Sequence, residues 1–579
     1  MIYFVNFIII LLFLFSSKEE AGVKKPNVIL ILTDDQGWGD LSFHQNPYLQ
    51  TPQIDQFATE SASFQNFYVS PLCAPTRASL LTGRYHLKTG AVSVSRGLEN
   101  MSRNEVTIAE VFKENDYATG CFGKWHNGEH YPENPNGQGF DEFLGFTAGH
   151  WSNYFDTELD HNDKKVKTKG YLPDVLTTAA LDFIDKNKEK PFFCYLPLNT
   201  PHSPFQVPSK YFDKYKSMGL DDELSCIYGM CENIDDNVGR ILSKIKKLNL
   251  EEETIIIFLS DNGPNGHRYN GVMKGIKAEV DEGGVKVPFF IKWKGKINPN
   301  KIENISAHID LLPTLIELCN LKVGAALPVD GISLYPDLLE ENPRTVERSI
   351  YTHLAFLDKK LKKYPGAVRT PEYTLILKGE EPELYNLSID PSQKHNLAKE
   401  KPEVVNLLNM EYEKWFEEAT IGLDFDRPIP LESHRMELSA HEANFSGNIS
   451  FFEGHGWAHD WLTNWKNEKD SIWWNVNAPK VATYTVYLKY NCLKENIDSQ
   501  ITVSAGLNKV SKKINKAFES DFIPSPDRVP RKEAYEKNWK LLKVGTLSIP
   551  DGKSKLLLTS SFIKNKEVAD VKAIVLDRN

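Results

Sequence analysis

Four short runs of apolar residues in the first 300 positions constrain the fold of this chain more than any other feature. Each run has the length of a strand that is buried on both faces of a sheet. The runs occupy residues 28–32, 192–196, 254–259 and 288–291. Amphipathic segments with helical spacing separate them, at residues 106–115, 175–187 and 224–248. Strands that alternate with helices predict an α/β fold, with a large, mainly parallel sheet flanked by helices.

The rest of the chain predicts further domains, because 579 residues exceed what one hydrophobic core normally serves. Short strand-like segments after residue 345 precede a helical segment at 402–418, and a Pro-rich linker follows at 427–430. From about residue 436 apolar and polar residues alternate, as in an antiparallel β-sandwich. We expect four parts: a signal peptide (1–21), the α/β domain (22–344), a small antiparallel C-terminal subdomain with a helix (345–430) and an appended accessory β-sandwich (431–579).

The N-terminus carries an apolar run that ends at Phe15, shorter than the roughly 20 residues of a membrane span. It favours a cleaved export signal over an uncleaved anchor, so we expect a periplasmic or secreted protein without a stable membrane span. The net charge of −10 argues against a nucleic-acid partner. Of the seven cysteines, Cys226 and Cys231 are spaced for a small disulfide loop in an exported protein.

Polar clusters follow three of the predicted strands. Asp34 and Asp35 come after the first run, His202 shortly after the second, and Asp261 and Asn262 after the third. Because parallel strands present their carboxyl ends at one edge of a sheet, we expect these clusters to converge. Three carboxylates and one amide oxygen form a hard-oxygen set suited to Ca²⁺ or Mg²⁺, and the scarcity of thiolate and imidazole argues against zinc.

Further strings add a thiol, cations and an imidazole, and all of these motifs occur in one order within residues 34–284. The added strings are Cys73-Ala74-Pro75-Thr76-Arg77, Leu81-Thr82-Gly83-Arg84, Gly123-Lys124-Trp125-His126, and Lys277 five positions ahead of Glu282-Gly283-Gly284. The ordered set resembles type I sulfatases, the formylglycine-dependent sulfatase family of the alkaline-phosphatase-like superfamily. The resemblance extends over roughly residues 26–425 and implies an enzyme that hydrolyses sulfuric esters.

The resemblance implies a modified residue and a metal ion. In that family a formylglycine-generating maturation enzyme oxidises the cysteine, here Cys73, to formylglycine (3-oxoalanine), whose hydrate attacks sulfur. A Ca²⁺ ion, with Mg²⁺ less favoured, would be bound by the modified Cys73 and four oxygen ligands. These four are Asp34, Asp35, Asp261 and Asn262.

The resemblance also assigns catalytic groups. Arg77 and Lys124 would hold and polarise the formylglycine hydrate, while Lys277 and His202 would face the sulfate ester. The metal and the cations would offset charge that develops on the sulfuryl oxygens. An imidazolium at His202 can protonate the departing sugar oxygen, and His126 would remove the second hydroxyl proton as sulfate leaves.

Two positions depart from the usual pattern of the family. Thr76 replaces the commoner serine of the cysteine signature. The string Gly275-Ile276-Lys277-Ala278 lacks the second glycine often seen there. We therefore expect a different local backbone around Lys277.

Two other functions stay open. The same superfamily contains phosphonate and phosphodiester hydrolases, some with the same cysteine signature. A non-catalytic carbohydrate-binding protein is the second alternative, because aromatic rings near the start of the sandwich can stack on sugars. The rings are Trp457, Trp461, Trp465, Trp473 and Trp474. We favour the interpretation that these tryptophans fill the sandwich core or a domain interface.

Export and the appended sandwich suit the degradation of a sulfated polysaccharide. We expect a sulfated carbohydrate substrate, with a marine algal glycan as the specific hypothesis. Candidate sugar contacts flank the motifs in predicted loops. They are His86, Arg96, His150, Trp151, His267 and Arg268.

Overall fold

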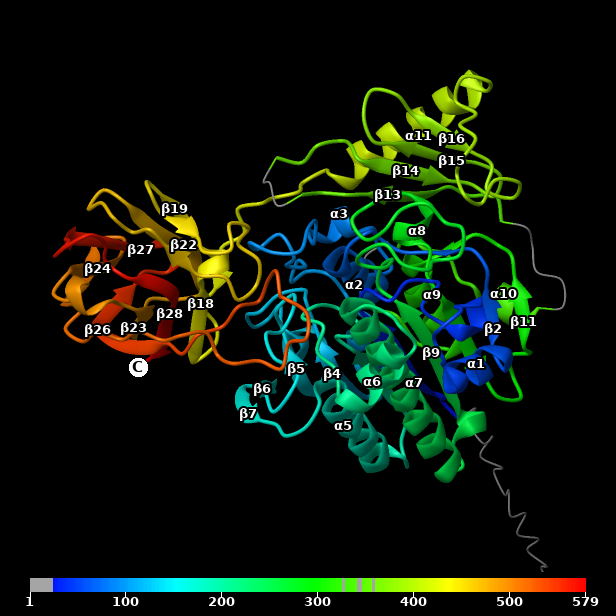
Figure 1. The fold of residues 1–579 in the computed structure, drawn as a ribbon, viewed down its shortest axis with the longest axis horizontal. Coiled ribbons are helices and arrows are strands. Elements are labelled where there is room, and N and C mark those ends of the chain that lie inside the picture. The colour runs from blue at the N-terminus through cyan, green and yellow to red at the C-terminus, as the bar shows by residue number, and fades with distance from the viewer. Residues whose placement is uncertain (1–23, 325–327, 341–345, 357–359) are drawn as a thin grey trace, which may run out of the picture.

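The computed structural model describes residues 24–324, 328–340, 346–356 and 360–579. The signal peptide expected at residues 1–21 lies outside them. Figure 1 shows a large sheet flanked by helices, a small sheet with one long helix, and two further sheets at the C-terminal end. None of the described helices is long and apolar enough to cross a membrane.

A ten-stranded mixed sheet organises the first part of the chain. Its strands lie in the order β11 (Asn300–Ile302), β2 (Ala62–Phe64), β10 (Phe289–Trp293), β9 (Thr254–Ser260), β1 (Asn27–Thr33), β8 (Phe192–Pro197), β4 (Ala118–Lys124), β5 (Glu142–Phe146), β6 (Glu158–His161) and β7 (Lys164–Lys167). The five strands from β9 to β5 run parallel. Strand β10 pairs antiparallel with β9, as β6 does with β5. The predicted α/β fold is confirmed, with a parallel centre and mixed edges.

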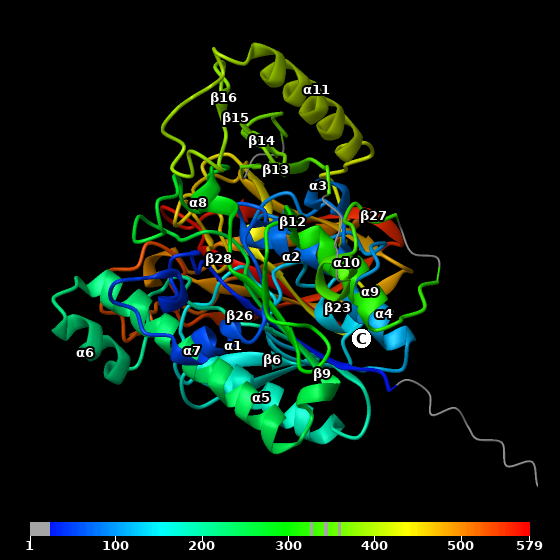
Figure 2. The same cartoon turned by 90° about the vertical axis from the view of Figure 1, so that its right-hand side faces the viewer.

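Strand β1 is buried on both faces, as its uninterrupted apolar run predicts. Val28, Leu30 and Leu32 belong to one hydrophobic cluster, and Ile29 and Ile31 belong to the other. Helices α2 (Cys73–Thr82), α4 (Ile108–Glu114) and α9 (Leu311–Leu318) contribute to the first cluster; α1 (Pro52–Thr59), α5 (Leu172–Asn187) and α7 (Asp222–Lys247) contribute to the second. Figure 2 shows these helices around the sheet.

Cys226 and Cys231 both lie on α7 as buried free thiols, so the disulfide loop suggested by their spacing does not form. Five residues of α-helix rise about 7.5 Å, which is farther than the Cα atoms of a disulfide can be separated.

The small sheet consists of β13 (Ile350–His353), β14 (Gly366–Arg369), β15 (Thr374–Leu377) and β16 (Glu383–Tyr385), all antiparallel. Helix α11 (Pro402–Ala419) packs on it, with Tyr412 and Trp415 in one cluster with Val368. Arg369 is fully buried, and its Nη2 donates to the Val280 carbonyl at 2.6 Å. The small sheet therefore supports the segment that carries Lys277.

The C-terminal part is a β-sandwich whose two sheets share one hydrophobic cluster. One sheet contains β17 (Ile429–Pro430), β22 (Ser471–Ala478), β27 (Gly552–Phe562), β24 (Gln500–Ala505) and β25 (Asn508–Lys513), and β19 (Asn444–Ser446) pairs with β22. The other contains β20 (Ser450–Phe451), β21 (Leu462–Thr463), β28 (Asp570–Arg578), β23 (Ala482–Asn491) and β26 (Lys540–Ile549), and β18 (Arg435–Ser439) pairs with β28. Part of the expected linker at 427–430 is thus strand β17, which pairs in parallel with β22.

Three of the five tryptophans are buried in the sandwich. Trp461, Trp465 and Trp474 have at most 1% of their surface exposed. Trp465 and Trp474 belong to the sandwich core, which confirms the core-filling interpretation for these two, and Trp461 stacks on Phe452. Trp473 lies under Lys555 Nζ, 5.2 Å from the ring centroid, and Trp457 stacks on His455. The buried rings are closed to a sugar.

Candidate active site

The carboxyl ends of the parallel strands bring the predicted polar clusters together. Asp34 and Asp35 follow β1, Asp261 follows β9, and Lys124 ends β4. Lys124 Nζ lies 2.7 Å from Asp34 Oδ2, and the Asp35 amide donates to Asp261 Oδ1 at 3.2 Å. All four residues have at most 1% of their surface exposed. The convergence expected from strand direction is confirmed.

Cys73 is the first residue of α2 and lies beside these carboxylates. Its Sγ and one oxygen each of Asp34 and Asp261 lie within 4.8 Å of one another. Burial raises the pKa of the Cys73 thiol, so the thiol stays neutral. Thr76 Oγ1 donates to the Ser70 carbonyl at 3.1 Å, so the threonine variant of the signature is hydrogen-bonded beside the first turn.

Arg77 connects α2 to the strand ends. Its Nε and Nη2 donate to Asp261 Oδ2 at 3.1 and 2.7 Å, and its Nη1 donates to the Lys124 carbonyl at 2.8 Å. Burial alone would raise the pKa of Asp34, but Lys124, His202 and Arg77 hold it well below its usual range. Asp34 is therefore an anion.

Lys277 and His202 lie on either side of the Asp35 carboxylate. Lys277 Nζ is 2.6 Å from Asp35 Oδ1, and His202 Nε2 is 3.7 Å from Asp35 Oδ2. The second nitrogen of His202, Nδ1, donates to the Ser203 carbonyl at 2.7 Å, because a carbonyl oxygen can only accept. Nε2 is thus the ring nitrogen of His202 that faces the site.

In His126 the hydrogen is on the other ring nitrogen than in His202. Its Nε2 donates to the Val94 carbonyl at 2.8 Å, and its buried Nδ1 has no hydrogen-bond partner among the described residues. Burial, together with the positive charge of Lys124, lowers the pKa of His126 well below its usual value. The imidazole is neutral, with a free lone pair on Nδ1.

The donor set fits a hard divalent cation. Asp34 Oδ1 and Asn262 Oδ1 are buried oxygens without a hydrogen-bond partner among the described residues. Asn262 Nδ2 donates to Asp35 Oδ1 at 2.8 Å, which orients the amide. Burial and the charge of Asp34 raise the pKa of Asp261, as expected where carboxylates crowd together. A cation among these oxygens would relieve both the repulsion and the missing contacts.

The backbone at Lys277 differs from an ordinary strand or helix. Ala278 has φ +64°, in the left-handed region that favours glycine. The amides of Lys277 and Ala278 donate to the carbonyls of Pro264 and Pro71 at 3.0 and 2.9 Å. These hydrogen bonds hold Lys277 beside Asp35 although the second glycine is absent.

Three of the six candidate sugar contacts lie beside these groups or beside the end of β5. The rings of His150 and His202 are 5.9 Å apart between centroids. Trp151 stacks on Phe146. Arg268 Nη2 donates to the Asp35 carbonyl at 2.8 Å and forms an ion pair with Asp40 at 2.6 Å, which gives it a structural role.

The other three candidates lie in different surroundings. His86 is buried, with 2% of its surface exposed, and stacks on His353, so it is closed to a sugar. The guanidinium of Arg96 lies 5.7 Å from the Phe451 ring of the sandwich. His267 is exposed, next to Arg268.

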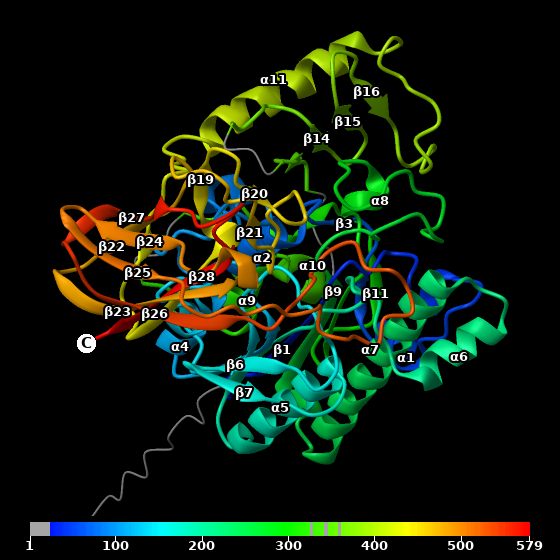
Figure 3. The ribbon, with the colours of Figure 1, turned by 60° about the vertical axis from the view of Figure 1, so that its left-hand side comes forward.

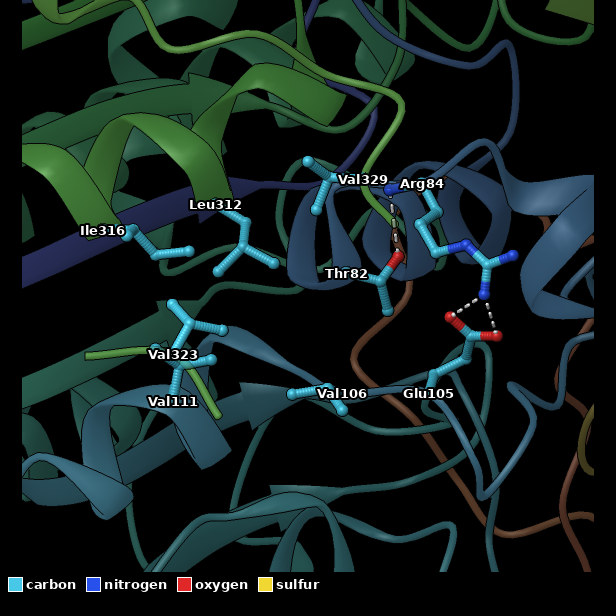
Figure 4. Close-up of a pocket in the computed structure, with 9 residues that line it drawn as sticks. All are labelled: Thr82, Arg84, Glu105, Val106, Val111, Leu312, Ile316, Val323 and Val329. Atoms are coloured by element: carbon cyan, nitrogen blue, oxygen red, sulfur yellow. Dashed lines mark hydrogen bonds and ion pairs between the residues drawn. The ribbon is translucent and has the colours of Figure 1, made fainter. Parts of the chain in front are cut away.

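Figure 4 shows a separate cavity at the end of α2, where the predicted Thr-Gly-Arg string has a structural role. Arg84 Nη1 forms an ion pair with Glu105 at 2.8 Å, and the Arg84 amide donates to Thr82 Oγ1. Gly83 has φ +67° and ends the helix. The rest of the lining is aliphatic: Val106, Val111, Leu312, Ile316, Val323 and Val329.

Sequence reasoning missed Glu533, which the sandwich brings to the site. Its Oε2 lies 3.7 Å from His150 Nδ1, and Ser203 Oγ donates to its Oε1. One ligand atom each of His150, His202 and Glu533 lies within 4.8 Å of the others. No local pattern in the sequence marks residue 533, because its position depends on how two distant parts of the chain pack.

Comparison with known proteins agrees with this geometry. The family described as Sulfatase matches residues 26–321, and the family described as N-sulphoglucosamine sulphohydrolase, C-terminal, matches residues 277–418. The ulvan-active sulfatase of Formosa agariphila is 31% identical over 413 residues, which cover 66% of this chain and 79% of that protein. Human arylsulfatase A is 31% identical over 459 residues, with 67% and 87% covered.

Solved structures are similar over the same part of the chain. The crystal structure of Ps i-CgsB in complex with k-i-k-neocarrahexaose aligns with a TM-score of 0.63 and 32% identity. The alignment covers 68% of this chain and 93% of that one. The family matched over residues 26–321, these relatives and the alkaline-phosphatase-like fold lead to one conclusion: the chain belongs to the sulfatase family and is a sulfuric ester hydrolase.

Proposed function

We propose that the protein hydrolyses sulfate esters of a sulfated polysaccharide, or of its oligosaccharides, after Cys73 has been converted to formylglycine. The position of Cys73 carries the proposal: it starts α2 with its Sγ within 4.8 Å of oxygens of Asp34 and Asp261. Because burial keeps the unmodified thiol neutral, the cysteine itself would be a weak nucleophile. Formylglycine would supply a geminal diol, one hydroxyl to attack sulfur and one to expel sulfate.

The metal in this proposal is Ca²⁺. Its ligands would be the modified Cys73, Asp34, Asp35, Asp261 and Asn262, and its charge would stabilise the sulfuryl oxygens. The buried oxygens of Asp34 and Asn262 that have no hydrogen-bond partner in the described part of the chain support this assignment.

Hydrogen bonds to backbone carbonyls leave one ring nitrogen of each histidine available for proton transfer. Nε2 of His202 would protonate the departing sugar oxygen, because its Nδ1–H is held by the Ser203 carbonyl. Nδ1 of His126 would accept the second proton, because its Nε2–H is held by the Val94 carbonyl and its imidazole is neutral. Lys277 Nζ, beside Asp35, would stabilise the sulfuryl charge.

The names of similar proteins support the substrate class. One relative is an ulvan-active sulfatase, and a similar solved structure contains k-i-k-neocarrahexaose. We therefore propose an exported enzyme, periplasmic or secreted, that acts on a marine algal glycan and is matured by a formylglycine-generating enzyme.

Sulfate release from a panel of sulfated algal oligosaccharides tests this function. We expect release by the wild type, none by Cys73→Ala, and formylglycine in the peptide that contains Cys73 by mass spectrometry. An active enzyme with an unmodified thiol would contradict the mechanism. Faster hydrolysis of bis(4-nitrophenyl) phosphate than of any sulfate ester would instead support the phosphodiesterase alternative.

A further inference from the structure

The segment between β25 and β26, residues 514–539, leaves the sandwich and lies against the part of the chain that contains the ten-stranded sheet, residues 24–324, here called the catalytic part (Figures 1 and 3). Hydrogen bonds to the loop after β8 anchor it there. Gln206 Nε2 donates to Asp527 Oδ1 at 2.6 Å, and Arg528 Nη1 donates to the Val207 carbonyl at 2.6 Å. The segment is thereby held beside the loop that follows β8.

Glu533 lies on this segment, next to two histidines of the catalytic part. Ser203 Oγ donates to Glu533 Oε1, and Glu533 Oε2 lies 3.7 Å from His150 Nδ1. His202 in turn lies 3.7 Å from Asp35. The sandwich therefore places a carboxylate beside the proposed proton donor, His202.

The two facing atoms of Glu533 and His150 are both hydrogen-bond acceptors. His150 Nε2 donates to the Ala458 carbonyl at 2.7 Å, so its Nδ1 carries a lone pair. Burial lowers the pKa of His150 to about 3, which keeps the ring neutral. Burial alone would raise the pKa of Glu533, but the neighbouring His150 and His202, together with the Ser203 hydroxyl, lower it to about 2. Each of these two acceptors needs a hydrogen-bond donor, which the hydroxyl groups of a bound ligand can supply in place of water.

Building on the proposed function, we propose that Glu533 and His150 bind two neighbouring hydroxyl groups of the sugar that carries the sulfate ester. One hydroxyl donates to Glu533 Oε2 and the other donates to His150 Nδ1. The 3.7 Å between these acceptors suits oxygens on adjacent ring carbons. The sandwich thus completes the sugar site of the catalytic part.

The same carboxylate selects against a second anion. The Glu533 side chain is only 15% exposed, so its charge is weakly screened by solvent. A sulfate or carboxylate group in place of either hydroxyl would bring like charges together and leave both acceptors without donors. The preferred substrate is therefore a singly sulfated sugar with a free diol near the ester.

A transition metal is the competing occupant of the same three side chains. Both histidines donate their other ring N–H to a backbone carbonyl, which is also the pattern of metal-ligating imidazoles. A metal on His202 would occupy the nitrogen that the proposed reaction uses for proton transfer. The diol is favoured because it leaves that nitrogen free.

Glu533→Gln tests the inference through a ratio of activities. The kcat/KM for a singly sulfated oligosaccharide is divided by the kcat/KM for 4-nitrophenyl sulfate, which has no sugar hydroxyls. We expect this ratio to fall about ten- to a hundredfold, mainly through KM, because a hydrogen bond to a charged acceptor is weakened. The relative activity on the same sugar with a second sulfate at the diol should rise. Glu533→Ala should lower the ratio in the same direction.

Asp521→Asn is the matched control, because it removes an exposed carboxylate from the same segment. It should keep the wild-type ratio. An unchanged ratio in both Glu533 variants, with an active wild type, would overturn the inference and leave the proposed function intact. A wild type that releases no sulfate from any sulfated sugar would overturn the proposed function itself. Cobalt(II) absorption bands that depend on Glu533 would assign the three side chains to a metal and overturn the diol.

Discussion

Arg77 Nη2 lies 2.7 Å from Asp261 Oδ2, and both side chains are fully buried. Two further N–H groups of the same guanidinium reach Asp261 and the Lys124 carbonyl. One side chain therefore holds the first turn of α2, where Cys73 stands, against the ends of β9 and β4. The candidate active site depends on this ion pair for its geometry as well as for its charge.

Arg77→Ala should cost about 3–5 kcal/mol of unfolding free energy, because it leaves the buried Asp261 carboxylate without its partner. Urea unfolding measures this loss, and sulfate release should fall below detection. Arg435→Ala is the control: the Arg435 side chain in its ion pair with Asp577 is 56% exposed, so we expect a loss of at most about 1 kcal/mol. Equal unfolding midpoints for Arg77→Ala and the wild type would contradict this assignment.

Calcium should stabilise the protein, because a ligand that binds only the folded state raises the unfolding free energy. In the chelator-treated enzyme, we expect saturating Ca²⁺ to raise Tm by about 5 °C or more, and Mg²⁺ to raise it less. Asp261→Asn should remove most of this response, whereas Asp551→Asn, at an exposed turn of the sandwich, should retain it. An identical calcium response in Asp261→Asn would exclude Asp261 as a ligand.

Local patterns account for the parts of the fold and site that the sequence predicts. An apolar run followed at once by Asp34 and Asp35 places carboxylates at the end of a buried strand, and the structure has them there. An apolar run does not show whether its strand pairs parallel or antiparallel with the neighbouring strand. The run at 288–291 predicts β10 but does not show that it pairs antiparallel with β9.

Local patterns do not predict the position of a residue that depends on packing between distant segments. His86 follows the cysteine signature closely and was expected to contact sugar, but helix α3 (His86–Thr89) turns it into the interior beside His353. Glu533 is the converse case. It has no motif around it, and only the docking of the segment 514–539 brings it to His150.

Ala278→Gly should stabilise the protein. The alanine has φ +64°, and a left-handed conformation costs an L-residue about 1–2 kcal/mol more than glycine. We expect a gain of about 1 kcal/mol in urea unfolding, after the greater chain entropy of unfolded glycine is subtracted. Ala278→Val, with a branched β-carbon, should destabilise instead. A lower midpoint for Ala278→Gly than for the wild type would show that the backbone is unstrained there.

Two buried ion pairs join the catalytic part to the start of the sandwich. His130 Nε2 lies 3.0 Å from Glu442 Oε2, and His441 Nε2 lies 3.3 Å from Glu129 Oε1. Burial alone would lower the pKa of each histidine, but Glu442 raises that of His130 to about 9, and Glu129 raises that of His441 to about 9. Both imidazoles are therefore charged at neutral pH.

These two pairs predict a loss of stability at alkaline pH. A histidine whose pKa is higher in the folded state stabilises the fold fully below its unfolded pKa, near 6.5, and ceases to do so as pH rises through about 9. We expect the free energy of unfolding to fall between pH 6.5 and 9.5, by on the order of 2 kcal/mol for each pair, and the urea midpoint to fall with it. In His130→Gln this dependence should be smaller, whereas His395→Gln, at an exposed position, should keep the wild-type profile. A wild-type midpoint that stays constant across this range would show that neither pair is charged in the folded protein.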